Sequence, residues 1–150
     1  MAYTPFDLTG KTVLVTGGNR GIGLGMAEAM AASNANIAIW GRKAEANSKA
    51  VEALSGLGTG DVKAWQVDVA DEQAVIDATA DVISSMGRID SCFANAGVGF
   101  GAPSFSEMTT EIWRANMAVN LEGAFWTLRE SVKHMVERAK AGDPGGSVVG

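Results

Sequence analysis

The stretch that decides the fold is TVLVTGGNRGIG, residues 12–23. Its first four residues are β-branched or leucine and predict a buried strand, and the Thr-Gly-Gly that follows predicts a tight turn. From Ile22 to about Ala32 the chain is rich in alanine, methionine and leucine, a composition that favours helix. A glycine turn that opens a helix points unpaired N–H groups at one place, where the helix dipole adds partial positive charge. The stretch therefore predicts an anion site suited to a pyrophosphate.

The three glycines at positions 17, 21 and 23 have separate predicted roles. Gly17 permits the sharp turn, Gly21 lets the backbone approach a ligand closely, and Gly23 lets the helix pack closely on the sheet. The spacing G-x-x-x-G-x-G differs from the common G-x-G-x-x-G, so a purely structural glycine turn stays open at this point. A second phosphate loop ending at residues 10–12 is rejected, because Pro5 stands where that motif needs glycine and the segment leads into a strand.

The rest of the chain alternates short apolar runs with longer amphipathic ones. Strands are predicted at 12–15, 36–40, 62–67, 89–94 and 147–150, and helices at about 22–32, 46–57, 71–87 (with Asp71 as N-cap and Gly87 as the stop) and 110–139. This order predicts an α/β fold with a doubly wound parallel sheet, Rossmann-like, in three αβα layers. Residues 1–150 are interpreted as one NAD(P)-binding Rossmann domain, with its ligand crevice at the carboxyl ends of the strands.

Composition excludes several classes of function. The net charge of −5 argues against nucleic acid as a partner, because phosphate backbones need an electropositive face. One histidine and one cysteine argue against a metal centre, so no metal ligands are predicted. No apolar run is long enough to cross a bilayer, the first residues lack a signal pattern, and a lone cysteine suits a reducing compartment. We therefore expect a cytoplasmic protein with no membrane partner.

The end of the second predicted strand bears on the choice of dinucleotide. NAD-binding folds commonly place Asp or Glu there to hold the ribose 2′-hydroxyl, but this chain has Gly41-Arg42-Lys43. A guanidinium can pair with a 2′-phosphate in bidentate fashion, so Arg42 favours NADP(H) over NAD(H). The alternative is that Arg42 and Lys43 simply begin a solvated helix.

Four motifs in order resemble the N-terminal part of the short-chain dehydrogenase/reductase family. The turn at 16–23 matches T-G-x-x-x-G-I-G, and Asp68-Val69 matches the pair that follows the third strand. Residues 94–97 read Ala-Asn-Ala-Gly where the family has N-N-A-G, so the first asparagine is replaced. Residues 119–123, Val-Asn-Leu-Glu-Gly, match V-N-x-x-G in the long central helix. The resemblance covers nearly the whole chain.

This resemblance implies hydride transfer between nicotinamide and a small carbonyl or secondary alcohol substrate. It implies that Asp68 and Val69 contact adenine and that Asn120 bends its helix and holds a water in a proton relay. A homodimer or homotetramer built partly on the long helix is also implied. The cofactor-binding residues carried over or inferred from the motifs are Thr16, Gly17, Asn19, Arg20, Gly21, Ile22, Gly23, Arg42, Asp68, Val69, Asn95, Ala96 and Gly97.

The family's acid–base residues do not occur within these 150 residues. In the family, a Ser and a Tyr-x-x-x-Lys follow a strand start matched here by residues 145–149, so the Ser would lie just past Gly150, and the only tyrosine is Tyr3. We expect the fold to be incomplete at its C-terminal side and this chain alone to be inactive. A non-catalytic dinucleotide-binding or interaction module is the alternative. A methyltransferase is disfavoured, because Gly41-Arg42 lacks the acid that such enzymes use for the ribose.

The remaining conspicuous side chains receive structural interpretations. Cys92 is predicted to be an inert core thiol and His134 to be solvated. On the long helix, the core or subunit contacts are predicted to include Trp113, Met117, Phe125 and Trp126. The residues predicted to face solvent are Glu130, Glu137, Arg138 and Lys140.

Overall fold

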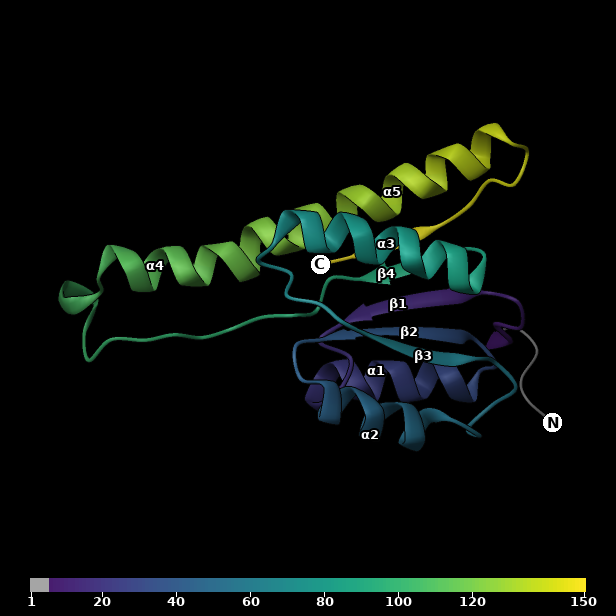
Figure 1. The fold of residues 1–150 in the computed structure, drawn as a ribbon, viewed down its shortest axis with the longest axis horizontal. Helices are drawn as coiled ribbons and strands as arrows, with labels where there is room; N and C mark the ends of the chain where they lie inside the picture. Colours follow the sequence, from purple (N-terminus) through teal and green to yellow (C-terminus); the bar gives the residue numbers. More distant parts are fainter. Residues whose placement is uncertain (1–5) are drawn as a thin grey trace.

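The computed structural model describes residues 6–150, so Tyr3 lies outside the described residues. Five strands form one sheet in the order β3-β2-β1-β4-β5, and each neighbouring pair is parallel. Helices α1 and α2 cover one face, and α3 and α5 cover the other (Figure 1). The predicted doubly wound, three-layer fold is thus confirmed. The strands are β1 (Thr12–Thr16), β2 (Asn36–Gly41), β3 (Val62–Gln66), β4 (Ser91–Phe93) and β5 (Ser147–Val149).

The strand order reverses next to β1. The chain runs outward from β1 through β2 to β3 and then returns to place β4 on the other side of β1. In open α/β sheets a ligand crevice forms where the order switches, at the carboxyl ends of the strands. The helices that make these crossings are α1 (Gly21–Ala32), α2 (Ala44–Leu54), α3 (Glu72–Met86), α4 (Thr110–Met117) and α5 (Ala124–Lys140), with a short 3₁₀ turn at Phe105–Glu107.

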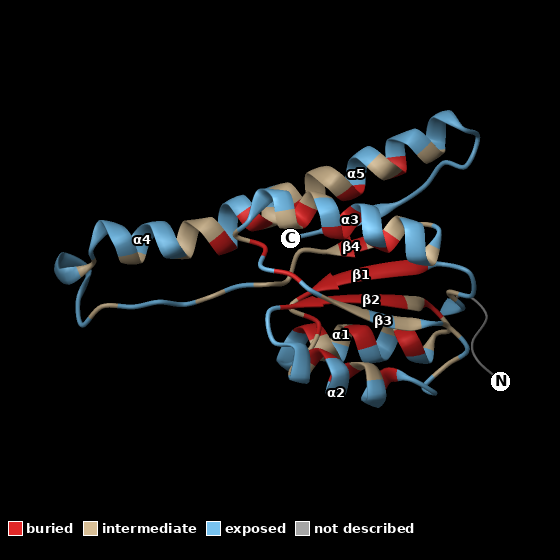
Figure 2. Ribbon diagram, in the orientation of Figure 1, coloured by how far each residue is buried: buried red, intermediate tan, exposed pale blue. Residues whose placement is uncertain are grey.

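Alternating strand residues build two separate cores. Leu14 and Trp40 pack with α3 residues such as Val75, whereas Val13 and Ile37 pack with the small residues of α1 and with α2. This division follows from the two-residue period of a strand, which sends successive side chains to opposite faces. β1 is buried along its whole length (Figure 2), as the unbroken apolar run predicts for a central parallel strand.

The ends of α2 and α3 can be compared with the cap and stop residues predicted from the sequence. The Asp71 carboxylate accepts a hydrogen bond from the Ala74 N–H, and α3 ends at Gly87 with φ +82°, so both predicted signals are confirmed. α2 ends at Leu54, earlier than the predicted stop near residue 57. The backbone is already extended at Ser55 (ψ 124°), and Gly56, one of the glycines predicted to end this helix, follows in the left-handed region (φ +90°).

The predicted long helix at 110–139 is present as one unbroken helical segment, but its middle is π-helical. A π-helical turn at Ala118–Gly123 lies between α4 and α5. Gly123 lies directly against Val69, and a Cβ atom at this position would meet the Val69 carbonyl oxygen at 2.8 Å. α4 extends beyond the edge of the sheet, and the chain that follows β4 runs alongside it in extended form (Figure 1). Asn120 lies inside the widened turn.

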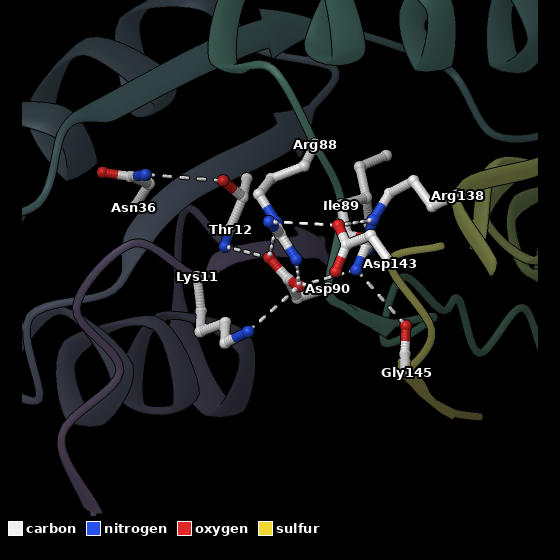
Figure 3. A network of polar contacts seen from close by, with 9 residues as sticks. All are labelled: Lys11, Thr12, Asn36, Arg88, Ile89, Asp90, Arg138, Asp143 and Gly145. Atoms are coloured by element: carbon white, nitrogen blue, oxygen red, sulfur yellow. Dashed lines mark hydrogen bonds and ion pairs between the residues drawn. The ribbon is translucent and has the colours of Figure 1, made fainter. Parts of the chain in front are cut away.

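An ion-pair network lies at the amino ends of β1 and β4 (Figure 3). Asp90 accepts hydrogen bonds from the Thr12 N–H (2.9 Å) and from Arg88 Nε (2.7 Å), and Arg138 approaches it at 3.3 Å. Burial opposes ionisation of Asp90, but the hydrogen bonds from Arg88 and Thr12 outweigh it and lower the pKa of the carboxyl group. The network thus joins β1 and β4 to α5.

Three predictions for the outer face of α5 are wrong. The Arg138 side chain is only 11% exposed because it enters the Asp90 network. Glu130 is also 11% exposed and pairs with Arg129 and Lys133. His134 is half-buried, and its Nε2 atom is buried without a hydrogen-bond partner among residues 6–150. Burial, followed by the positive charge of Arg138, lowers the pKa of His134.

The apolar side chains of α4 and α5 divide between core and surface. Trp126 packs against the core, and Met117 is half-buried. Trp113 and Phe125 are 55% and 57% exposed, so neither is a core residue of this chain. The exposed positions of Glu137 and Lys140 agree with the prediction.

Candidate cofactor-binding site

A cavity of about 540 Å³ lies at the carboxyl ends of β1, β2, β3 and β4. The glycine turn forms one wall, the end of β2 another, and the segments after β3 and β4 complete it. All predicted cofactor residues line this cavity except Thr16. The cavity is also lined by residues that the sequence analysis did not predict to bind the cofactor, namely Trp40, Gly41, Lys43, Ala46, Val67, Val98 and Val119.

Thr16 lies behind the wall of the cavity and is 1% exposed. Its hydroxyl accepts a hydrogen bond from the Ala96 N–H (2.9 Å) and faces the Phe93 carbonyl at 3.4 Å. Thr16 therefore joins the ends of β1 and β4 and does not itself face the cavity.

The glycine turn has the geometry of an anion cradle. Gly17 (φ +65°) and Gly21 (φ +55°) adopt left-handed backbone, which favours glycine. The first-turn N–H groups of residues 21–23 have no acceptor among residues 6–150, and this turn of α1 holds no acidic residue or side-chain cap. The N–H groups are therefore free to bind an anion.

Gly23 makes the closest approach in this wall. A Cβ atom there would collide with the Gly17 carbonyl oxygen and the Asn95 carboxamide. The predicted close contact exists, but it is made with the turn and with Asn95, two residues after β4. Asn95 Nδ2 donates to the Thr16 carbonyl (3.0 Å), so the same carboxamide also ties β4 to the turn.

The rim of the cavity is positively charged, although the whole chain carries −5. Arg20, Arg42 and Lys43 are exposed and line the cavity, and none of them makes an ion pair within residues 6–150. Asp68 is the one carboxylate in the lining, and its Oδ1 accepts from the Ala70 N–H (3.0 Å). Three unpaired cations around one carboxylate favour a ligand with more than one negative group.

Asn47 is a buried polar residue that the sequence analysis missed. It is 5% exposed on the inner face of α2, beside Ala50 and Leu54. Its carboxamide donates to the carbonyls of Gly41 and Trp65, both at 3.0 Å, and accepts from Asn19 Nδ2 at 2.8 Å. The sequence carried one signal for the burial of Asn47. Residues 47, 50 and 54 share one face of the helix, so Asn47 is a polar residue within the apolar stripe that is expected to be buried.

Asn120 and Asn116 hold the segment after β4 against the helix. Asn120 Oδ1 accepts from the Val98 N–H and its Nδ2 donates to the Val98 carbonyl, both at 2.8 Å. Asn116, four residues earlier, makes the same pair of contacts with Phe100 at 3.0 and 2.9 Å. Residues four apart share one helix face, and this spacing was the signal that could have pointed to Asn116. The contacts fix the wall formed by Gly97 and Val98.

Other chemistries have little support in the part of the chain that the structure describes. Cys92 is buried in the core as predicted, and burial raises the pKa of its thiol to about 11, which disfavours the reactive thiolate. Residues 6–150 contain no group of three or more His, Cys, Asp or Glu side chains that could hold a metal ion. None of the helices in this range is both long and apolar enough to span a bilayer.

A parallel sheet with this strand order, and with the free N–H groups of a helix N-terminus at its carboxyl edge, is typical of dinucleotide-binding α/β proteins. Residues 11–149 match the family model described as short chain dehydrogenase. The chain belongs to this family.

Relatives of known sequence and structure agree with this assignment. The chain is 33% identical over 136 residues to 2,5-dichloro-2,5-cyclohexadiene-1,4-diol dehydrogenase of Sphingobium indicum, covering 91% of this chain and 53% of the relative. It resembles the structure of NAD⁺-bound xylitol dehydrogenase with a TM-score of 0.87 and 27% identity, over 94% of this chain and 52% of the other. It resembles a metagenomic short-chain oxidoreductase in complex with NADP with a TM-score of 0.83 and 29% identity, over 94% and 62%. The chain thus spans about half the length of the curated relatives it matches.

Proposed function

We propose that this chain forms the cofactor-binding part of an NAD(P)-dependent oxidoreductase that prefers NADP(H). The substrate class is a small carbonyl compound or secondary alcohol. Family membership supports the reaction class. The cavity with its free N–H groups and cationic rim is the observation that carries the proposal for this chain.

The residues present fit a dinucleotide along the length of the cavity. The N–H groups of residues 21–23 would hold the pyrophosphate, and the absence of a Cβ at Gly21 leaves open space beside them. Asp68 and Val69 would border the adenine, and residues 95–97 would border a ribose. The bound nicotinamide supplies the hydride donor or acceptor, and the protein's part is to bind, orient and exclude water.

The preference for NADP(H) rests on the end of β2. Arg42 lines the cavity there with an unpaired guanidinium among the described residues, and Lys43 adjoins it. A 2′-phosphate would give this cation a partner, whereas the 2′-hydroxyl of NAD(H) would leave it without one. The solved relatives include complexes with both NAD⁺ and NADP, so the preference depends on Arg42 in this chain.

Asn120 is proposed to take part in proton transfer. Its two contacts with Val98 use one N–H and one lone pair of the carboxamide, which leaves one of each for a water molecule. The same contacts hold Val98 and Gly97 at the cavity wall, so Asn120 also shapes the site.

Two further proposals concern assembly and location. An apolar surface on α4, the π-helical turn and α5, which includes Trp113, Leu121 and Phe125 at 55–62% exposure, supports a homo-oligomer built partly on this long helix. Light scattering of the protein in its native full length would show a monomer if this is wrong. A cytoplasmic location is proposed from the single, buried cysteine, which has no disulfide partner.

The proposal is tested by calorimetric titration of the protein, in its native full length, with NADPH and NADH. Absorbance at the reduced nicotinamide band would then follow turnover of a panel of ketones and aldehydes. We expect binding of both cofactors, tighter binding of NADPH, and turnover of at least one carbonyl compound. Binding without turnover would favour a non-catalytic dinucleotide-binding module, and no binding of either cofactor would refute the proposal.

A further inference from the structure

We propose that Asn47 is a positioning residue that sets the cavity's preference for a 2′-phosphorylated dinucleotide. It does so by fixing the glycine turn relative to the strand end that carries Arg42. This inference rests on the proposed function, since it assumes that the cavity binds a dinucleotide and that Arg42 meets the 2′-phosphate.

The carboxamide of Asn47 joins three segments that are distant in the sequence. Its two N–H groups donate to the carbonyls of Gly41, at the end of β2, and Trp65, in β3. Its oxygen accepts from Asn19 in the glycine turn. Because both N–H groups are taken by carbonyls, the oxygen must face Asn19, and a flipped amide would place oxygen against oxygen. The orientation of the side chain is therefore determined by its partners.

The contact between Asn19 and Asn47 joins the middle of the turn to α2, while the Gly17 N–H donates to the Trp40 carbonyl of β2 at the start of the turn (2.8 Å). Within residues 6–150, the contact from Asn19 to Asn47 is the one hydrogen bond that joins residues 18–20 to β2 or α2. The two carboxamides lie directly against Gly41, since a Cβ atom at this glycine would collide with both. The tie thus lies immediately beside the residue that precedes Arg42.

Arg42 is held from the other side by β3. Gln66 Nε2 donates to the Arg42 carbonyl at 3.0 Å, so the main chain at Arg42 is placed by contacts with its neighbours while its guanidinium stays exposed. The separation between the N–H groups of residues 21–23 and this guanidinium then depends on the bond from Asn19 to Asn47, together with the backbone bond from Gly17 to Trp40.

Of the two dinucleotides, only the 2′-phosphorylated one would place a phosphate group both on the N–H groups of the glycine turn and on the Arg42 guanidinium. Its pyrophosphate would lie on the glycine turn and its 2′-phosphate on Arg42. A shift of the turn relative to Arg42 would therefore misalign one of these two charged contacts. NAD(H) lacks the 2′-phosphate, so its binding should depend less on the separation between the glycine turn and Arg42. Loss of the Asn47 tie should therefore weaken NADPH more than NADH.

The variant Asn47→Leu tests this inference, because leucine has a similar size but cannot form the hydrogen bonds. Calorimetric titration of the protein in its native full length would compare NADPH with NADH, and 2′,5′-ADP with 5′-AMP. We expect the ratio of Kd for NADH to Kd for NADPH to fall by about tenfold, the effect of one charge-assisted hydrogen bond. The matched control is Ser48→Ala, since among residues 6–150 the exposed Ser48 hydroxyl has one hydrogen bond, to the Ala44 carbonyl of its own helix.

A purely structural role would give a different result. In that case Asn47→Leu would lower the melting temperature while both affinities changed by the same factor, and the inference would be overturned. If Asn47→Leu does not fold, Asn19→Ala removes the same bond from the turn, and the ratio should fall there too. Where both variants fold, adding Asn47→Leu to Asn19→Ala should leave the ratio unchanged, because coupled residues are not additive.

The wild-type titration separates the two proposals. If wild type prefers NADPH and the variants keep its ratio, Asn47 does not position the site and the proposed cofactor preference stands. If wild type binds NADPH no better than NADH, the proposed preference fails, and the inference about Asn47 fails with it.

Discussion

Replacing Arg42 by aspartate should reverse the cofactor preference. Arg42 lies immediately after β2, lines the cavity, and has no ion-pair partner within residues 6–150. The substitution removes the cation proposed to meet the 2′-phosphate. It also installs a carboxylate where NAD-binding folds commonly hold the ribose 2′-hydroxyl.

The size of the effect follows from the charges involved. A hydrogen-bonded contact between a guanidinium and a phosphate contributes about 1.5–3 kcal/mol, equivalent to a factor of about 10–150 in Kd. Aspartate adds repulsion toward the 2′-phosphate and a new acceptor for the 2′-hydroxyl of NADH. The ratio of Kd for NADH to Kd for NADPH should therefore fall by at least about 100-fold.

Calorimetric titrations of wild type and Arg42→Asp with both cofactors would measure this ratio, at low and at physiological salt. The matched control is Lys49→Asp, which makes the same charge change on the exposed side of α2 and, within the described residues, breaks one surface pair with Glu45 (2.7 Å). An unchanged ratio in Arg42→Asp would refute the reasoning. An equal change in Lys49→Asp would show that only the overall field of the protein matters.

Three other variants test the packing and the charges around the site. Gly23→Ala would place a Cβ against the Gly17 carbonyl, so we expect a loss of about 1–3 kcal/mol in unfolding free energy and a parallel weakening of NADPH and NADH; a change in their ratio would contradict this. Asp90→Asn breaks a largely buried ion pair with Arg88, and urea unfolding should show a loss of about 3 kcal/mol, with no loss meaning that the network does not support the fold. His134 has a pKa lowered from 6.5, so the unfolded chain binds its proton more tightly and stability falls as the pH drops below about 6.5. In His134→Leu, the free energy of unfolding measured by urea titration should change less between pH 7 and pH 5. An identical pH dependence in the variant would rule out His134 as its source.

Much of the fold could be predicted because its signals are local. The apolar run at 12–15, the glycines at 17 and 21, and Asp71 and Gly87 act through their own backbone angles or through residues within one helical turn. The order of strands and helices then follows from the preference of parallel strands for covered faces and right-handed crossings. The same local reading placed Arg42 at the end of β2, beside the cavity.

The contacts that bring distant segments together could not be read in this way. Asn19 and Asn47 are 28 positions apart, and Thr16 meets Ala96 across 80 positions. A sequence pattern reports whether a residue is polar, but it does not report which distant carbonyl or amide will face that residue.

The sequence by itself determined the class of the sheet, the glycine turn and the cationic strand end, since neighbouring residues dictate these through backbone geometry. Only the tertiary structure decided that Arg138 turns inward to Asp90, that Thr16 lies behind the cavity wall, and that the long helix widens at Asn120. Each of these depends on a partner supplied by another segment, and that partner is in place only after the chain has folded.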